Sequence, residues 1–213
     1  MIHAQRCLTL AAAATFAVAS TAHATSVSFQ GALAQDNSTA VVSFSSAAGG
    51  SVTIETFSYA GGTNANGQLI SAGGFDPVFA LFSSAGALIA YGDDGAARVD
   101  AVTGAAFDAL LTSSLAPGSY FIALSQWDSY AIGPNYGNGF IEDGAANTSF
   151  TAAYGCAAGH FCDVNGYSRS ANYAISISGG DVVAVPEPGR LALLGLGLPG
   201  ILLARRWRAR KAP

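Results

Sequence analysis

Basic side chains are almost absent from the middle of this 213-residue chain. Of its nine Lys and Arg residues, only Arg98 and Arg169 lie between residues 25 and 184, whereas only Glu187 of its thirteen acidic residues lies outside that range. The central part therefore carries a net charge of about −10. Because phosphate binding needs clustered Lys and Arg, this composition excludes a nucleic-acid partner. The other seven basic residues lie near the two ends: Arg6, Arg190, Arg205, Arg206, Arg208, Arg210 and Lys211.

Groups that are typical of catalytic centres are also scarce. His3 and His23 lie near the N-terminus, which leaves His160 as the only imidazole of the central part. The chain contains no G-x-S-x-G elbow, no H-E-x-x-H motif and no Walker loop. No spacing of acidic residues selects a carboxylate pair for glycoside hydrolysis. We therefore expect no enzyme activity, and an accessory domain with an uncharacterised activity is the least favoured alternative.

Cysteine is rare, and its spacing argues for a structural role. Cys7 lies in the N-terminal segment, so Cys156 and Cys162 are the only pair in the central part. With His160 they would leave a zinc site one ligand short, and their spacing is not that of a C-x-x-C redox motif. In an oxidising compartment we expect a disulfide that closes a short loop and stabilises it by about 2 kcal/mol.

The N-terminal segment has the three parts of a secretory signal peptide. A short basic region, residues 1–6, precedes an apolar run, residues 7–19, and Ala22-His23-Ala24 is an A-x-A cleavage site. We expect export through the Sec machinery and removal of residues 1–24, with cleavage between Ala24 and Thr25. The remaining chain has room for one domain, residues 25–184.

The C-terminal segment, residues 185–213, combines three features. Pro186, Glu187 and Pro188 precede an apolar run, and basic residues follow at 205–211. The pattern predicts a transmembrane helix at about 189–205, with the basic tail on the cytoplasmic side. The fourteen apolar residues 191–204 would span only about 21 Å as a helix, less than the roughly 30 Å hydrocarbon core. Such a short span indicates a processed anchor.

The order of Pro-Glu-Pro motif, apolar helix and basic cluster resembles the PEP-CTERM sorting signals of Gram-negative bacteria that make exopolysaccharide. The resemblance implies that an exosortase in the inner membrane recognises Pro186-Glu187-Pro188 and cleaves near it. It also implies a precursor that is transiently anchored in the inner membrane and then reaches the cell surface or the extracellular matrix. An ordinary membrane tail is the alternative, but such a tail needs no Pro-Glu-Pro motif and is usually longer.

Residues 25–184 alternate between short apolar runs and turn residues, which predicts an all-β domain. Two hairpins are expected, one joining residues 39–45 to 51–59 and one joining 75–82 to 87–91. No stretch has a convincing helical period, although residues 101–111 leave room for a short helix. The pattern predicts an antiparallel β-sandwich of jelly-roll type. The remaining expected strands cover residues 27–29, 107–115, 120–126 and 172–178.

The central part also carries a family resemblance. The order Gly-Gly-Phe-Asp-Pro, a hairpin, Asp-Asp and then Leu-Ala-Pro-Gly-Ser-Tyr loosely resembles the pre-peptidase C-terminal domains, which are β-sandwiches appended to secreted enzymes. Over nearly the whole mature chain, the sequence also resembles exported bacterial proteins that carry PEP-CTERM tails. These resemblances imply fold and location, and they imply no particular chemistry.

Three aspartates flank the second expected hairpin. If its strands pair through residues 83–86, Asp76, Asp93 and Asp94 fall at one end, where carboxylate oxygens suit Ca²⁺. The alternative is that Asp76 caps a turn and that Asp93 and Asp94 form an exposed turn. Ca²⁺ is therefore the one cofactor that the sequence suggests.

Two classes of function follow from the sequence. The first is an exported, exosortase-processed structural or adhesive protein associated with exopolysaccharide and biofilm, without catalysis. The second is a Ca²⁺-dependent carbohydrate-binding module. Aromatic residues in the late loops would either stack on sugar rings or pack against the sandwich. These residues are Trp127, Tyr130, Tyr136, Phe140 and Tyr154.

Overall fold

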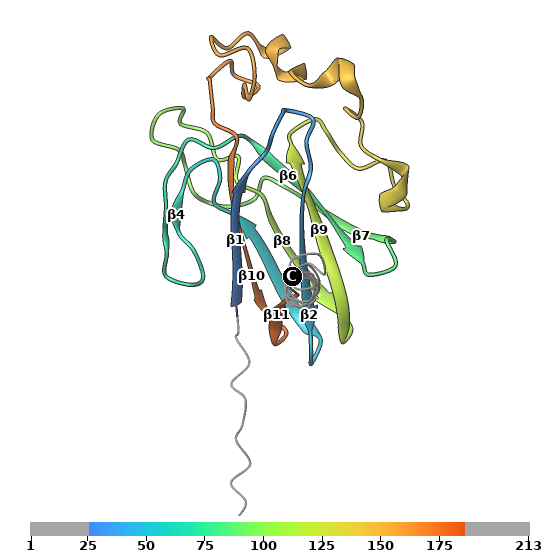
Figure 1. Ribbon diagram of the computed structural model, residues 1–213. Helices are drawn as coiled ribbons and strands as arrows, with labels where there is room; N and C mark the ends of the chain where they lie inside the picture. The colour runs from blue at the N-terminus through green and yellow to red at the C-terminus, as the bar shows by residue number, and fades with distance from the viewer. Residues whose placement is uncertain (1–25, 186–213) are drawn as a thin grey trace, which may run out of the picture.

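Strands with alternating apolar and polar residues build a sandwich of two antiparallel sheets, which the computed structural model describes over residues 26–185 (Figure 1). Every second side chain of a strand points to the same face, so one face of each strand can enter the core. The first sheet has the strand order β1-β10-β3-β8 and the second has the order β11-β2-β9-β6-β7. The all-β sandwich expected from the sequence is confirmed.

The elements have the following bounds. The first sheet consists of β1 (Ser26–Ala32), β10 (Asn172–Gly179), β3 (Gly50–Thr56) and β8 (Leu110–Leu115). The second consists of β11 (Val182–Ala184), β2 (Ala40–Ser46), β9 (Gly118–Gln126), β6 (Pro77–Ser83) and β7 (Leu88–Asp93). A separate ribbon joins β4 (Gly62–Thr63) and β5 (Leu69–Ile70). Three 3-10 helices lie between β9 and β10: η1 (Tyr136–Asn138), η2 (Ala145–Asn147) and η3 (Phe150–Tyr154).

The core lies between the two sheets. Phe44 of β2, Ile54 of β3 and Ile177 of β10 are fully buried in one cluster of apolar side chains. β6 is buried on both faces, because Leu81 faces the core between the sheets and Phe82 packs with Phe140 of a loop on the outer side. This confirms the sequence interpretation of residues 75–82 as a doubly covered strand.

The first expected hairpin is wrong, although both of its strands exist. β2 pairs with β9 and β11, whereas β3 pairs with β10 and β8, so the chain crosses from one sheet to the other between Ser46 and Gly50. Their apolar faces meet across the core, where Phe44 and Ile54 are both fully buried. The second hairpin is confirmed by the pairing of β6 with β7.

Residues 101–111 do not form a helix; a turn at 101–103 is followed by the start of β8 at Leu110. The last residues of this segment pair with β3 as an extended strand, and this places Leu111 against the core. Within residues 26–185, no helix is long and apolar enough to cross a membrane. The expected signal peptide, the Pro-Glu-Pro motif, the apolar run and the basic tail all lie outside the described residues.

The outer faces of the two sheets differ. A loop that we call the cover loop, residues 127–143, lies over the outer face of the second sheet, where Phe82 and Ala123 pack with Phe140. The outer face of the first sheet, which we call the open face, carries short polar side chains. Two hydroxyl pairs bridge its strands, Ser28 with Ser176 at 2.7 Å and Thr53 with Thr112 at 3.1 Å.

The two ends of the described chain leave the sandwich at different heights. β1 begins at the end opposite the long segment between β9 and β10, which is drawn in yellow to orange (Figure 1). β11 also begins at that end, but it runs along β2 as far as Phe44, so Val185 lies midway along the edge of the second sheet. The N-terminal segment is therefore joined to the domain at the end opposite the long loops, and the C-terminal segment at a sheet edge.

Candidate functional site

The pairing of β6 with β7 brings the three predicted calcium ligands to one end of the hairpin. Val78 pairs with Asp93, so Asp76 and Asp94 lie just beyond the last paired residues. Asp76 is 2% exposed, whereas Asp93 and Asp94 are exposed. Asp94 has a positive φ of 48°, as expected for an aspartate in a tight turn.

Asp76 is an unusual carboxyl group, because its Oδ1 is buried without a hydrogen-bond partner in the described part of the chain. Burial, together with the negative charges of Asp94 and Asp93, raises its pKa to about 9. It is therefore protonated at neutral pH unless a cation offsets the cost of its charge. Two other buried oxygens without a partner, Oε1 of Gln126 and Oγ of Ser129, lie at and just beyond the end of β9 that pairs with Pro77 of β6.

The three aspartates do not form a complete ligand set. Among residues 26–185, no three His, Cys, Asp or Glu side chains are grouped so that they could hold a metal ion. Asp93 also has another partner, because it accepts a hydrogen bond from the Tyr130 hydroxyl. The partnerless oxygen of Asp76 fits a cation, but the carboxylate grouping does not supply the rest of a Ca²⁺ shell. The calcium site therefore stays a prediction.

Four other buried aspartates fix the loops, a role that the sequence interpretation missed. Asp36 accepts backbone N–H bonds from Thr151 at 3.1 Å and Phe161 at 2.8 Å, which ties the turn before β2 to the late loops. Asp108 accepts them from Tyr59 at 3.1 Å and Ala60 at 2.9 Å. Their acceptor oxygens satisfy buried donors, so these carboxylates serve the fold. The four are Asp36, Asp100, Asp108 and Asp163.

The expected disulfide is present. Cys156 and Cys162 are joined, with their Cα atoms 5.4 Å apart, and Cys162 is fully buried. The ring of His160 lies 5.7 Å from the ring of Phe161, a core residue. This arrangement pins the loop that carries Phe161 into the core.

The late-loop aromatics divide into two groups. Tyr136 and Phe140 pack against the second sheet, with Tyr136 edge-on to Phe82 at 5.5 Å and to Phe121 at 5.2 Å. Both rings belong to the cover loop's packing; Phe140 is buried, whereas Tyr136 is 36% exposed. The other three are half-buried: Trp127 and Tyr154 form a ring pair, and the Tyr130 hydroxyl donates to Asp93.

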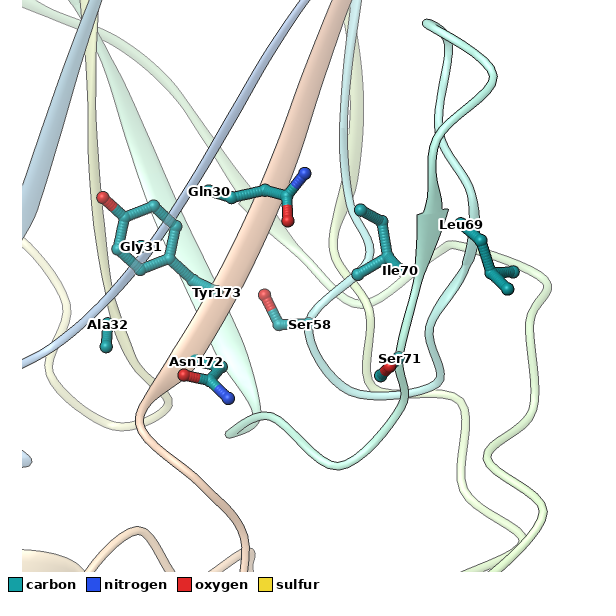
Figure 2. A pocket seen from close by; sticks show the side chains of 9 residues that line it. All are labelled: Gln30, Gly31, Ala32, Ser58, Leu69, Ile70, Ser71, Asn172 and Tyr173. Carbon is teal, nitrogen blue, oxygen red and sulfur yellow. The ribbon is translucent and has the colours of Figure 1, made fainter.

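A groove on the open face was not predicted from the sequence. It has a volume of about 630 Å³ and lies between the β4–β5 ribbon and the strands β1 and β10 (Figure 2). Gln30 and Asn172 reach it from β1 and β10, and Leu69, Ile70 and Ser71 form the opposite wall. No sequence signal joins these positions, because the residues that meet there come from four distant segments.

Comparisons with known proteins find a distant structural likeness and no sequence relative. No protein-family model matches the chain, and no curated protein matches its sequence. Among solved structures, it is similar to the pre-peptidase C-terminal domain of a collagenase from Bacillus anthracis. The two are 13% identical, with a TM-score of 0.34, and the match covers 74% of this chain and 88% of that one. A likeness at this level carries no argument about fold or function.

Proposed function

We propose that this chain is an exported, exosortase-processed protein of a polysaccharide-rich cell surface or extracellular matrix, with a structural or adhesive and non-catalytic role. The observation that carries the proposal is the order Pro186-Glu187-Pro188, apolar run and basic tail, together with the A-x-A site at Ala24. In this proposal the Sec machinery exports the precursor and the basic tail holds it in the inner membrane. An exosortase then releases it.

The properties of residues 25–184 support a role at the cell surface or in the extracellular matrix. A net charge of about −10 keeps an exported domain soluble, and the disulfide suits an oxidising compartment. The strand orders β1-β10-β3-β8 and β2-β9-β6-β7, with β11 added at one edge, support the jelly-roll connectivity that we infer for this domain.

Intact mass spectrometry of the protein recovered from a host with an active exosortase tests the proposal. We expect an N-terminus at Thr25 and the loss of everything beyond the Pro-Glu-Pro region. A Pro186→Ala, Pro188→Ala variant should keep its C-terminal segment and remain in the membrane fraction. A wild-type C-terminus still at Pro213 in that host would contradict the proposal.

A second candidate, a Ca²⁺-dependent carbohydrate-binding module, is favoured by the partnerless buried oxygen of Asp76. A bound cation would satisfy that oxygen and offset the charges of Asp93 and Asp94. A hundredfold excess of Ca²⁺ over its Kd would stabilise the native state by about 2.7 kcal/mol. Thermal unfolding with Ca²⁺, compared with NaCl at matched ionic strength, measures this effect. An equal shift in an Asp93→Asn, Asp94→Asn variant would reject these two ligands.

A further inference from the structure

We propose that the groove between the β4–β5 ribbon and the open face binds a segment of a neutral polysaccharide. This inference rests on the proposed function for its choice of occupant, because a polysaccharide layer surrounds a protein displayed in this way. The groove's own chemistry supports the same choice. Its hydrogen-bonding groups, its apolar wall and its lack of charge each fit a neutral sugar chain.

The floor of the groove offers unused hydrogen-bonding groups. Gln30 and Asn172 are exposed, and neither amide takes part in a hydrogen bond within residues 26–185. Figure 2 shows the Gln30 side chain reaching across β10 towards the ribbon, with Asn172 further along β10. A primary amide both donates and accepts, so it matches a sugar hydroxyl, which does the same. Ser71 adds a free hydroxyl on the opposite wall.

The ribbon supplies an apolar wall opposite these amides. Ile70 points toward the amides, whereas Leu69, which is 84% exposed, lies at the outer side of the same wall (Figure 2). Sugar rings have apolar C–H faces as well as hydroxyl edges, so a ligand between the two walls meets both kinds of surface. Binding sites commonly combine apolar lining with a few placed polar groups, in volumes of roughly 300–1,000 Å³.

The groove is uncharged, which selects against an anionic polymer. No Asp, Glu, Lys or Arg side chain lines it. The two cations of the domain are already engaged, Arg98 with Glu55 at 2.5 Å and Arg169 with Asp100 at 3.3 Å. A polyanion would approach a domain with a net charge of about −10 and find no free cation to pair with. A neutral chain carries no such cost.

One glycine shapes the end of the groove. Gly31 pairs with Tyr173 across β1 and β10, and a Cβ at Gly31 would lie 2.6 Å from the Tyr173 hydroxyl oxygen. The missing side chain therefore lets the tyrosine ring lie across β1, as Figure 2 shows, and pack against the core, so that it holds the two strands beside the groove together.

Affinity electrophoresis of the exported protein, recovered from its host, tests the proposal. The probes are four neutral polymers, dextran, laminarin, galactomannan and xylan, with alginate as an anionic probe. We expect at least one neutral polymer to retard the protein and alginate not to do so. Chelator should not change the retardation, because no carboxylate lines the groove.

Variants assign the binding to the groove. Gln30→Ala with Asn172→Ala should weaken association about tenfold, since two hydrogen-bonding side chains are lost. Ser71→Arg should weaken it by filling the groove. The control Asn147→Ala with Asn165→Ala removes two amides elsewhere and should bind as wild type. Unchanged melting temperatures would show that all variants fold.

Three results would overturn the proposal: no retardation by any neutral polymer, retardation by alginate alone, or wild-type binding by the Gln30→Ala, Asn172→Ala variant. The measurement is independent of C-terminal processing. A protein that keeps Pro213 but binds laminarin would refute the sorting proposal and leave the groove intact. A correctly processed protein that binds none of the neutral polymers would support the sorting proposal and refute the groove proposal.

Discussion

The two outer faces of the sandwich carry different kinds of side chain, apolar on the second sheet and polar on the first. On the second sheet, Phe82 and Ala123 are apolar, and the cover loop buries them beneath Tyr136 and Phe140. On the first sheet, the open face carries hydroxyl and amide side chains that need no cover. Apolar surface left in water costs free energy, whereas short polar side chains remain hydrated at little cost.

This difference separates stability from binding. The cover loop's aromatic residues contribute mainly to the free energy of unfolding, and few of their groups are left for a ligand. The open face contributes little to stability, so its groove can carry free hydrogen-bonding groups. Changes on the two faces should therefore have different consequences.

The largest expected effect is on the covered side. Phe140 is 5% exposed, so Phe140→Ala should lower the free energy of unfolding by about 3–5 kcal/mol, through lost burial and a cavity. Urea unfolding measures the loss. The neighbouring Ile141 is 54% exposed, and Ile141→Ala should change stability by less than about 0.5 kcal/mol. Similar losses in both variants would show that the loop does not cover the sheet.

The next effect concerns the disulfide in the long segment between β9 and β10. Replacing Cys156 and Cys162 by Ser should lower the free energy of unfolding by about 2 kcal/mol, because the unfolded chain loses a short closed loop. Reductant should destabilise the wild-type protein by the same amount and leave the variant unchanged. If the variant also responds to reductant, the effect has another source.

Asp76, at the end of the covered sheet, should make stability depend on pH. Its pKa is about 9 in the folded protein against an ordinary 3.8, so the native state holds a proton that the unfolded state releases. Without Ca²⁺, its contribution is fully present below about pH 4 and falls by up to about 1.4 kcal/mol per pH unit towards pH 9. Asp76→Asn should therefore gain stability relative to wild type as the pH rises.

Chemical denaturation at a series of pH values gives that difference. Asp181→Asn, which removes a carboxylate from an exposed turn, is the matched control and should track the wild type. A constant difference between Asp76→Asn and wild type would mean that Asp76 is ionised throughout the range.

The smallest effect belongs to the open face. Thr53→Val removes one partner of the exposed hydroxyl pair with Thr112 and should change the free energy of unfolding by about 0.5 kcal/mol or less. Thermal unfolding of Thr53→Val and Phe140→Ala, measured together, compares the stability that each face contributes. A loss near that of Phe140→Ala would remove the distinction between the faces.

Local patterns in the sequence were sufficient for most strands. Alternation around Val52 and Ile54 marks β3, and the apolar run at residues 75–82 marks β6, because each depends on residues next to each other in the chain. The pairing of β2 could not be predicted in the same way. Its partner β9 lies about eighty residues later, and alternation says which face is buried without saying which strand lies beside it.

The candidate sites show the same limit. The sequence places Asp76, Asp93 and Asp94 together, since one hairpin connects them, but it does not reveal that Asp76 is buried without a partner. Asp36 and Asp163 enter the sequence analysis only through the net charge, whereas both are buried acceptors of backbone N–H groups. The motif Asp163-x-Asn165-Gly166 is typical of an Asx turn and was the available signal.

The position of the chain ends has a consequence for tethering. Ser26 begins β1 at the end of the sandwich opposite the long loops, whereas β11 runs from that end along the edge of the second sheet, and Val185 lies beside Ser43, midway along β2 (Figure 1). A precursor held by its C-terminal segment would therefore be attached at a sheet edge. The groove is formed by β1, β10 and the β4–β5 ribbon, so β11 is not part of it. Removal of the N-terminal or the C-terminal segment would leave the groove's lining unchanged, so the protein could engage polymer while still tethered and after release.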